Sequence, residues 1–228
     1  MLGARALAEE LMDADDLDPA VYAAVLTDLA KVNRVTMAAR PTLNFLSTVL
    51  AGQTHFRLLD VGYGDGDMLR VIATWAQSKG LTAELVGIDL NPRSAVVARA
   101  ATPDSMTIDY RTGDYATLGD APFDVIISSL VAHHMTHDQL IAFLRFMDRQ
   151  ARLGWFINDL HRHGFAWVGY PLLAALMRWH PIVRHDGQLS IARSYRPSEW
   201  PPILAEAQIS GARVVPVFPF RLCVEQIR

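Results

Sequence analysis

Short apolar runs alternate with amphipathic segments over residues 57–160, and this alternation constrains the fold more than any other feature of the sequence. The runs have the length of buried strands. In the segments between them, apolar residues recur three and four positions apart, as on one face of a helix. Strands that alternate with helices form parallel sheets covered on both faces, because a crossover helix joins each strand to the next. The pattern therefore predicts a doubly wound α/β fold.

The expected elements follow from these patterns. Ahead of the alternation we expect helices over 4–12 and 18–50, with Pro41 either starting a fresh helix or kinking the first one. Within it we expect strands at 57–61, 83–90, 106–114, 123–130 and 154–160, and helices at 67–80, 92–102 and 137–151. After an apolar segment come a polar loop over 180–195, a helix over 196–207 and a terminal hairpin over 212–227.

Composition excludes several classes of protein. The chain has 228 residues, of which 51% are apolar, and this suits one α/β domain with a sizeable core. A net charge of −3 gives no basic face for nucleic acid, and a single cysteine, Cys223, excludes an internal disulfide or a cysteine-based zinc site. The apolar stretch 165–177 is too short to span a membrane. Because the amino end turns acidic before any apolar signal core, we expect a cytoplasmic protein.

A glycine-rich turn follows the first expected strand. In "LLDVGYGDGDML", Asp60 ends the strand and is followed by Gly62, Gly64 and Gly66 before the next helix. Glycines at a strand-to-helix turn indicate that a ligand approaches the backbone closely. In open α/β sheets such ligands bind outside the carboxyl ends of the strands.

The next two strand ends carry residues that suit an adenosine. Asp89 is placed to accept hydrogen bonds from a ribose diol. Asp114 is placed to accept one from an exocyclic amine, and the backbone of Tyr115 to meet a ring nitrogen. Dinucleotide sites need no acid among their glycines, whereas Asp65 and Asp67 lie within and just after this turn. Negative charge there suits a ligand with an ammonium and a sulfonium better than a pyrophosphate.

These motifs resemble those of a known family. Residues 57–160 look like the core of class I S-adenosylmethionine-dependent methyltransferases: "LLDVGYGDG" matches the first motif, "VGIDL" the second, "RTGDY" the third and "FDVIISSLVAHHM" the fourth. The resemblance implies a mostly parallel seven-stranded sheet with a terminal antiparallel hairpin. It also implies a helical cap over 1–52, a catalytic domain over 53–228 and a lid inserted at about 161–195, in one compact unit. More loosely, the chain is similar to bacterial small-molecule methyltransferases encoded near polyketide synthases.

The resemblance also implies roles for residues at the strand ends, with S-adenosylmethionine as the cofactor. Around its methionine part it places Asp60, Gly62, Gly64, Gly66 and Ser129. Around its adenosine it places Asp89 at the ribose hydroxyls, Asp114 at the adenine, and Leu90 and Tyr115 beside the ring. Tyr63 departs from the pattern, because the family more often has a small residue there, and it would narrow the pocket or reach toward Asp89.

Histidines are the candidates for acid–base chemistry, because imidazole titrates near neutral pH. His133 and His134 follow the fourth strand, and His134 is the first choice as a base or as a group that orients the acceptor. The alternative is that both pack or cap the next helix. His133 and His137 have the spacing of two metal ligands on a helix, but no acidic residue completes the set, so we expect no metal site. His185 is a further candidate for catalysis or a salt-bridged turn.

Together these features predict an S-adenosylmethionine-dependent methyltransferase that acts on a small, mostly apolar acceptor. The acceptor is expected to be phenolic, enolic or polyketide-like, and the reaction O-methylation. Three alternatives remain at this point: a carbon methyltransferase of the quinone-biosynthesis type, a nicotinamide-dependent oxidoreductase, and a non-catalytic cofactor-binding subunit.

Overall fold

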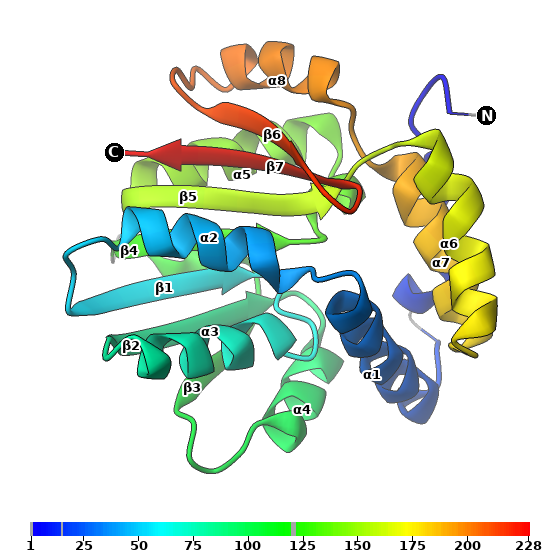
Figure 1. Ribbon diagram of the computed structural model, residues 1–228, viewed down its shortest axis with the longest axis horizontal. Coiled ribbons are helices and arrows are strands. Elements are labelled where there is room, and N and C mark those ends of the chain that lie inside the picture. The colour runs from blue at the N-terminus through cyan, green and yellow to red at the C-terminus, as the bar shows by residue number, and fades with distance from the viewer. Residues whose placement is uncertain (1, 15, 120–121) are drawn as a thin grey trace.

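The fold is built on one sheet of seven strands in the order β3-β2-β1-β4-β5-β7-β6 (Figure 1). A computed structural model describes residues 2–14, 16–119 and 122–228. The strands β1 to β5 are mutually parallel, and β7 pairs antiparallel to β5 and to β6. Their bounds are β1 His55–Val61, β2 Thr82–Asp89, β3 Ile108–Thr112, β4 Phe123–Ser129, β5 Ala151–Leu160, β6 Arg213–Val217 and β7 Arg221–Ile227. The predicted architecture, including the terminal antiparallel hairpin, is confirmed.

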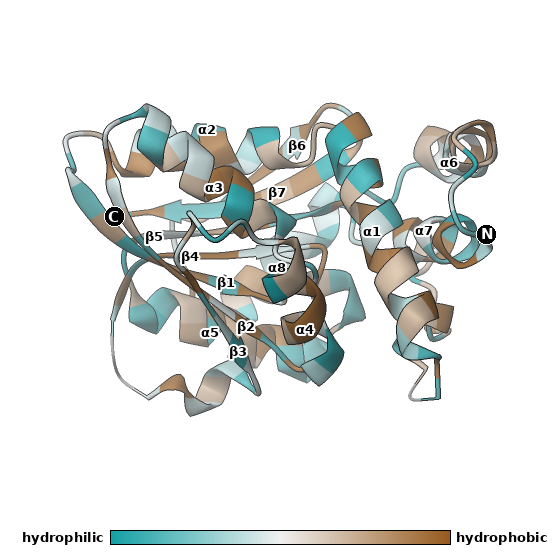
Figure 2. Ribbon diagram, turned by 90° about the horizontal axis from the view of Figure 1, so that it is seen from below, coloured by the Kyte–Doolittle hydropathy of each residue, from teal (hydrophilic) through white to brown (hydrophobic). Residues whose placement is uncertain are grey.

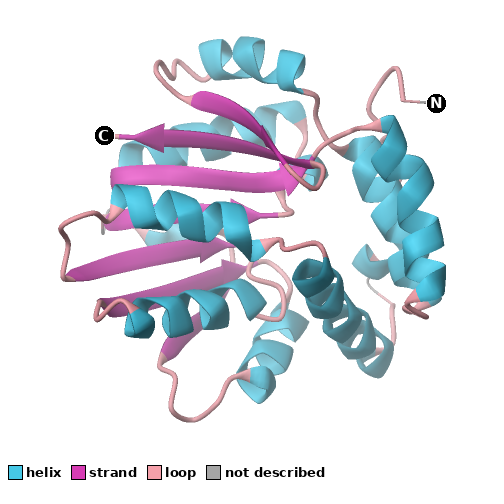
Figure 3. Cartoon of the chain, in the orientation of Figure 1, coloured by secondary structure: helices cyan, strands magenta, loops and turns pink. Residues whose placement is uncertain are grey.

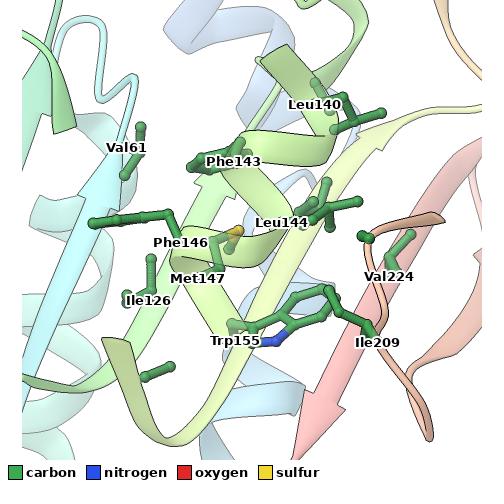
Figure 4. Packing of buried hydrophobic residues seen from close by; sticks show 14 of the residues in the cluster. Val61, Ile126, Leu140, Phe143, Leu144, Phe146, Met147, Trp155, Ile209 and Val224 are labelled. Carbon is green, nitrogen blue, oxygen red and sulfur yellow. The ribbon is translucent and has the colours of Figure 1, made fainter. Parts of the chain in front are cut away.

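Helices cover both faces of this sheet. On one face lie α2 (Ala39–Val49), α3 (Asp67–Ser78) and α4 (Pro92–Ala101), and on the other lie α5 (His137–Gln150) and α8 (Trp200–Glu206). The α5 face is the larger of the two cores: Phe143 and Met147 lie against Ile126 and the fully buried Trp155 (Figure 4). Burying side chains of this size supplies the main free energy that holds helix to sheet.

Three further helices stand off the carboxyl ends of the parallel strands. They are α1 (Pro19–Val35), α6 (Gly164–Leu176) and α7 (Pro181–Arg193), and they occupy the same end of the sheet in two perpendicular views (Figures 1 and 2). A third core cluster joins them, in which Val25 and Val32 of α1 meet Ala174, Trp179 and Val183. The loops that enter and leave the strand ends therefore lie beneath a helical cover (Figure 3). No helix in the described part of the chain is long and apolar enough to cross a membrane.

The predicted strands and the helices between them all form. The expected helix over 18–50 is two helices, and Pro41 lies in the first turn of α2, so the fresh-helix interpretation of Pro41 is confirmed. The break falls at Met37, whose φ of 52° lies in the left-handed region.

Two predictions of local structure are wrong. Residues 4–12 are helical only in a short 3₁₀ turn, η1 (Leu11–Asp13); the extended part lies beside α7, where the Ala6 amide donates to the Ala192 carbonyl over 3.0 Å. The expected loop over 180–195 is α7 for most of its length. His180 caps this helix and Pro181 occupies its first turn, a position that favours helix initiation. In the sequence, the many polar residues of α7 obscure the pattern of the few apolar positions that pack into the third core cluster.

The close contact between α6 and α7 gives a stability prediction of unusual sign. A methyl group on Gly187 of α7 would lie 2.2 Å from the ring of Tyr170, whose hydroxyl donates to the Val183 carbonyl over 3.0 Å. Helix propensity alone would make Gly187→Ala stabilising by about 1 kcal/mol. Because the ring must move and lose its hydrogen bond, we expect a loss of about 1–3 kcal/mol in the free energy of unfolding instead.

Urea unfolding followed by circular dichroism measures this effect. The matched control is Gly169→Ala, since Gly169 lies in α6 and a methyl group there would meet nothing within 4 Å. We expect the control to be neutral or stabilising. A stabilising Gly187→Ala would show that α6 and α7 do not pack as described.

Candidate active site

A cavity of about 670 Å³ lies between the strand ends and the helical cover. Its floor comes from the turns after β1, β2 and β4, and its walls come from α1, α6, α7 and the amino-terminal segment. The cover presents mostly apolar side chains to it: Leu26, Leu29, Val32, Phe165, Tyr170 and Leu173. The cavity therefore has a polar floor at the sheet and an apolar ceiling.

The glycine turn forms part of the floor, and its three glycines meet different steric requirements. All three have positive φ values, which glycine adopts without strain. A side-chain carbon on Gly62 would lie 2.3 Å from Val131, and one on Gly66 would lie 2.4 Å from the Tyr110 hydroxyl. The nearest atom to such a carbon on Gly64 is Leu26 Cδ2, at 3.9 Å. Gly62 and Gly66 are thus required by packing, whereas Gly64 leaves open space at the cavity.

Three carboxyl groups lie close together on this floor. The pKa values of Asp60, Asp67 and Asp89 are all raised, chiefly because burial disfavours their charged forms. Neighbouring carboxylates raise them further, and Asp60 is affected by both Asp67 and Asp89. Asp60 Oδ1 is buried and accepts no hydrogen bond from the described residues. A floor of this kind stabilises a ligand that brings positive charge.

The remaining contacts of these groups fix their positions. Asp89 accepts from the backbone amides of Gly64, over 3.0 Å, and Asn91, over 2.9 Å. Asp67 accepts from Asn33 of α1 over 3.0 Å, which ties the cover to the floor. Asp65 instead pairs with Arg70 over 2.9 Å.

The other residues predicted at the adenosine end are placed unequally. Leu90, Tyr115 and Ser129 line the cavity. Asp114 is exposed and caps the turn η2 (Tyr115–Leu118) by accepting from the Ala116 amide over 2.9 Å, and it is absent from the described lining. Most of the Tyr63 ring is buried against Tyr110, with ring centroids 5.0 Å apart, so its bulk is taken up by the core.

His133 is buried in an acidic setting. It lies in η3 (Ala132–His134), where its Nδ1 is 2.7 Å from Asp159 Oδ1 and its Nε2 is 3.6 Å from Glu10 Oε1. Burial lowers the pKa of His133, but Asp159 and Glu10 outweigh burial and raise it to about 9. The two carboxylates therefore favour the protonated form of this imidazole.

The other candidate histidines differ in position. His134 lines the cavity and its Nδ1 lies 3.2 Å from Asp13 Oδ2. His185 is more than half exposed and pairs with Asp186, and the described cavity lining does not include it. His137 pairs on the surface with Glu206 over 2.8 Å. The structure therefore brings His133 and His134 to the site, but leaves His185 and His137 outside it.

Two residues of the site were missed by sequence reasoning. Glu10 comes from the amino-terminal segment, which Asp186 holds in place by accepting from the amides of Leu11 and Met12 over 3.0 and 2.9 Å. Arg221, at the start of β7, is buried and lines the cavity, and its Nη1 has no hydrogen-bond partner in the described structure. Neither residue has a sequence motif around it that signals a cavity.

Comparison with known proteins assigns the domain. Residues 58–154 match the family model described as "Methyltransferase domain". This part of the chain is thus similar to methyltransferase domains. The matched region runs from β1 into β5 and so includes the cavity floor. A search of curated protein sequences finds no match to this chain.

Solved structures share its fold. The plantazolicin methyltransferase BpumL, in complex with a triazolic substrate analogue and S-adenosylhomocysteine, is 15% identical, with a TM-score of 0.67 over 89% of each chain. A SAM-dependent methyltransferase from Aquifex aeolicus is 18% identical, with a TM-score of 0.61 over 92% of this chain and 98% of its own. Human N-acetylserotonin methyltransferase is 14% identical, with a TM-score of 0.67 over 98% of this chain and 60% of its own.

The Asp60 carboxyl, whose Oδ1 accepts no hydrogen bond from the described residues, gives a prediction for the ligand-free protein. We expect Asp60→Asn to raise the free energy of unfolding at pH 7 by about 1 kcal/mol or more, because it removes an uncompensated buried charge without changing the shape of the side chain. The folded pKa of Asp60 lies above its usual value of 3.8, so the carboxyl destabilises the fold increasingly as pH rises through 3.8. The advantage of the variant should therefore shrink as pH falls toward 3.8.

Thermal unfolding at several pH values measures this difference. Asp104→Asn serves as the control, since Asp104 is exposed, and its effect should stay within about 0.5 kcal/mol. A less stable Asp60→Asn at pH 7 would mean that Asp60 is compensated in the ligand-free protein.

Proposed function

We propose that this methyltransferase transfers the methyl group of S-adenosylmethionine to an oxygen of a small, mostly apolar acceptor. The observation that carries the proposal is the unpaired Asp60 carboxyl, buried beside two further carboxyls on the floor of one large cavity. When bound, S-adenosylmethionine supplies an electrophilic methyl group on a sulfonium. The same molecule carries an ammonium, and both positive charges suit this floor.

Different residues of the floor would contact different parts of the cofactor. Asp60 and Asp67 would face its positive groups. The buried Arg221, whose Nη1 has no hydrogen-bond partner in the described structure, would face the carboxylate of its methionine part. Asp89, already fixed by two backbone amides, has lone pairs left for the ribose hydroxyls. The backbone of the glycine turn and Ser129 would lie beside the methionine part of the cofactor. Leu90, Tyr115 and Asp114 would surround its adenine.

The apolar ceiling supports the choice of acceptor. Side chains of α1 and α6 line the part of the cavity away from the floor, and they would bury an acceptor with few polar groups. We propose that residues 1–52 and about 161–195 act as a cap and a lid on the domain formed by 53–228. Similar structures include a plantazolicin methyltransferase, a magnesium protoporphyrin IX methyltransferase and an N-acetylserotonin methyltransferase. Proteins of this fold thus include methyltransferases named for chemically different acceptors.

His134 is the residue proposed to act on the acceptor. Its Nδ1 faces Asp13, so its Nε2 is left to take the proton of an acceptor hydroxyl, and the Asp13 carboxylate would stabilise the imidazolium that forms. The rest of catalysis is positioning, because holding the two reactants in line lowers the barrier by about 7–11 kcal/mol. A carbon methyltransferase of the quinone type would need no such base.

Cofactor binding tests the floor. We expect Asp89→Ala to abolish S-adenosylhomocysteine binding in calorimetry, because ribose hydroxyls would lose their acceptor and the turn would lose its Gly64 anchor. The wild-type protein should bind S-adenosylhomocysteine and ignore NAD and NADP. Wild-type affinity in Asp89→Ala would refute the ribose assignment, and binding of NAD alone would refute the cofactor.

Turnover tests His134. A metabolite extract incubated with isotopically labelled S-adenosylmethionine identifies the acceptor by the label it acquires. On that acceptor we expect His134→Ala to lower kcat by about 10²–10⁴-fold while S-adenosylhomocysteine binding is retained. His137→Ala is the matched control, since His137 pairs with Glu206 on the surface, and its kcat should not change. An unchanged kcat in His134→Ala would leave that side chain a packing role and favour carbon methylation.

A further inference from the structure

Three side chains on one wall of the cavity converge in the manner of metal ligands. Glu10 arrives from the amino-terminal segment, and His133 and His134 arrive from η3 after β4. Glu10 Oε1 lies 3.6 Å from His133 Nε2 and 3.8 Å from His134 Nε2, and the three potential ligand atoms all lie within 4.8 Å of one another. All three residues also line the cavity. They come from distant parts of the chain, so the fold alone brings them together.

Each of these side chains is oriented by a second group behind it. The Nδ1 atom of His133 is held by Asp159 at 2.7 Å, and that of His134 by Asp13 at 3.2 Å. The Ser190 hydroxyl donates to Glu10 Oε1 over 2.7 Å. Metal-binding histidines almost always present one ring nitrogen to the ion and donate the proton of the other to a carboxylate or carbonyl. Both imidazoles here have that arrangement, and both turn Nε2 toward Glu10.

One nitrogen of the cluster is not within direct hydrogen-bond distance of its neighbour. His133 is 2% exposed, and its Nε2 makes no hydrogen bond within the described residues; it faces Glu10 Oε1 at 3.6 Å. Buried polar atoms usually have a direct partner, and one without it is a place where another species can complete the site. The gap between Nε2 and Glu10 is such a place.

We propose that Glu10, His133 and His134 bind one divalent transition-metal ion on the wall of the acceptor cavity. Two imidazoles and one carboxylate are the ligand set of zinc and of non-haem iron(II) sites, and they do not suit magnesium or calcium, which prefer oxygen. Metal–ligand bonds of about 2.0–2.2 Å set the ligand atoms about 3–3.5 Å apart. The separations of 3.6 and 3.8 Å from Glu10 to the two imidazoles need to close by a few tenths of an ångström, and the two imidazole nitrogens lie within 4.8 Å of one another.

Charged groups surround the two imidazoles. Carboxylates of Glu10, Asp13 and Asp159 lie beside them. Arg193 lies 4.0 Å from Glu10 Oε1, and its Nη1 donates to the Ala8 carbonyl over 3.0 Å. Arg5 and Arg221 interact with Asp159. Arginines therefore balance part of the negative charge, and the case for a metal ion depends on the ligand geometry.

The role of the ion rests on the proposed function. Because its protein ligands lie on the cavity wall, the ion would keep its open positions toward the acceptor and bind the hydroxyl oxygen directly. The coordinated hydroxyl would release its proton to solvent. The oxygen then forms the bond to the methyl carbon, and the sulfur keeps the electron pair of the bond that breaks. In this form of the enzyme the ion takes over the task assigned to His134 as a base.

This site differs from the pair considered in the sequence. The spacing of His133 and His137 suits a helix-borne site, but His137 pairs with Glu206 on the surface. The acidic ligand that the sequence did not reveal is Glu10, far away in the chain.

Titration of the full chain with metal alone tests the proposal. Protein freed of metal by chelator is titrated with Zn²⁺ in calorimetry and with Co²⁺ followed by its visible absorption. We expect one equivalent to bind, and the Co²⁺ spectrum to show nitrogen ligation. Glu10→Gln and His134→Ala should each weaken binding by about 100-fold or more, beyond the range seen when an outer partner is lost. Asp13→Asn should weaken it by about 10-fold.

Three controls separate the outcomes. His137→Ala should leave the affinity unchanged; a loss there instead would place the ion on the surface and overturn the proposal. If Glu10→Gln does not fold by circular dichroism, the result for the partly exposed His134 decides. Stoichiometry of zero, or wild-type affinity in His134→Ala, overturns the metal site. S-Adenosylhomocysteine binding to the metal-free protein is measured alongside. If it is retained while metal does not bind, only the metal site fails; if it is lost, the proposed function fails.

Discussion

The position of β1 between β2 and β4 is the constraint on which the rest of the molecule depends. The chain builds outward from β1 in one direction through β2 and β3, and in the other through β4 and β5. The turns after β1 and β4 therefore diverge to opposite faces of the sheet, and a crevice opens between them. Asp60, next to the last residue of β1, lies within this crevice, and the turn after β4 brings His133 and His134 to its rim. The order of the strands therefore determines where both the cavity floor and the two histidines lie.

The cover is fixed to this frame by polar contacts as well as by apolar packing. Asn33 of α1 reaches Asp67 on the floor, and Asp186 of α7 holds the amides of Leu11 and Met12. Arg5 adds a further connection, because it donates to the carbonyls of Arg193 and His133. These bonds are partly buried, so their loss would leave donors and acceptors unsatisfied. The residues that enclose the cavity are thus also hydrogen-bond partners of one another.

Sequence patterns predicted the sheet because its signals are local. Apolar runs, helical periods and glycine turns each occupy a few consecutive residues. The expected strand ends also placed Asp60 and Asp89 at one cavity, and both residues line it. The α7 helix was missed because consecutive polar residues, Arg184, His185 and Asp186, interrupt its apolar positions. Such a polar run is typical of a loop. Glu10 and Arg221 were missed for a different reason: each reaches the cavity through tertiary contacts with residues far away in the chain, and such contacts leave no periodic pattern in the sequence.

The amino-terminal segment has a consequence for which changes would alter the cavity. The segment carries Glu10 and Asp13 into the cavity wall, yet it has little regular structure and is held to α7 by side-chain and backbone hydrogen bonds. Two acidic side chains of the wall are therefore positioned by α7 and not by the sheet. A substitution in α7 can reshape that wall while the sheet and its two main cores stay intact.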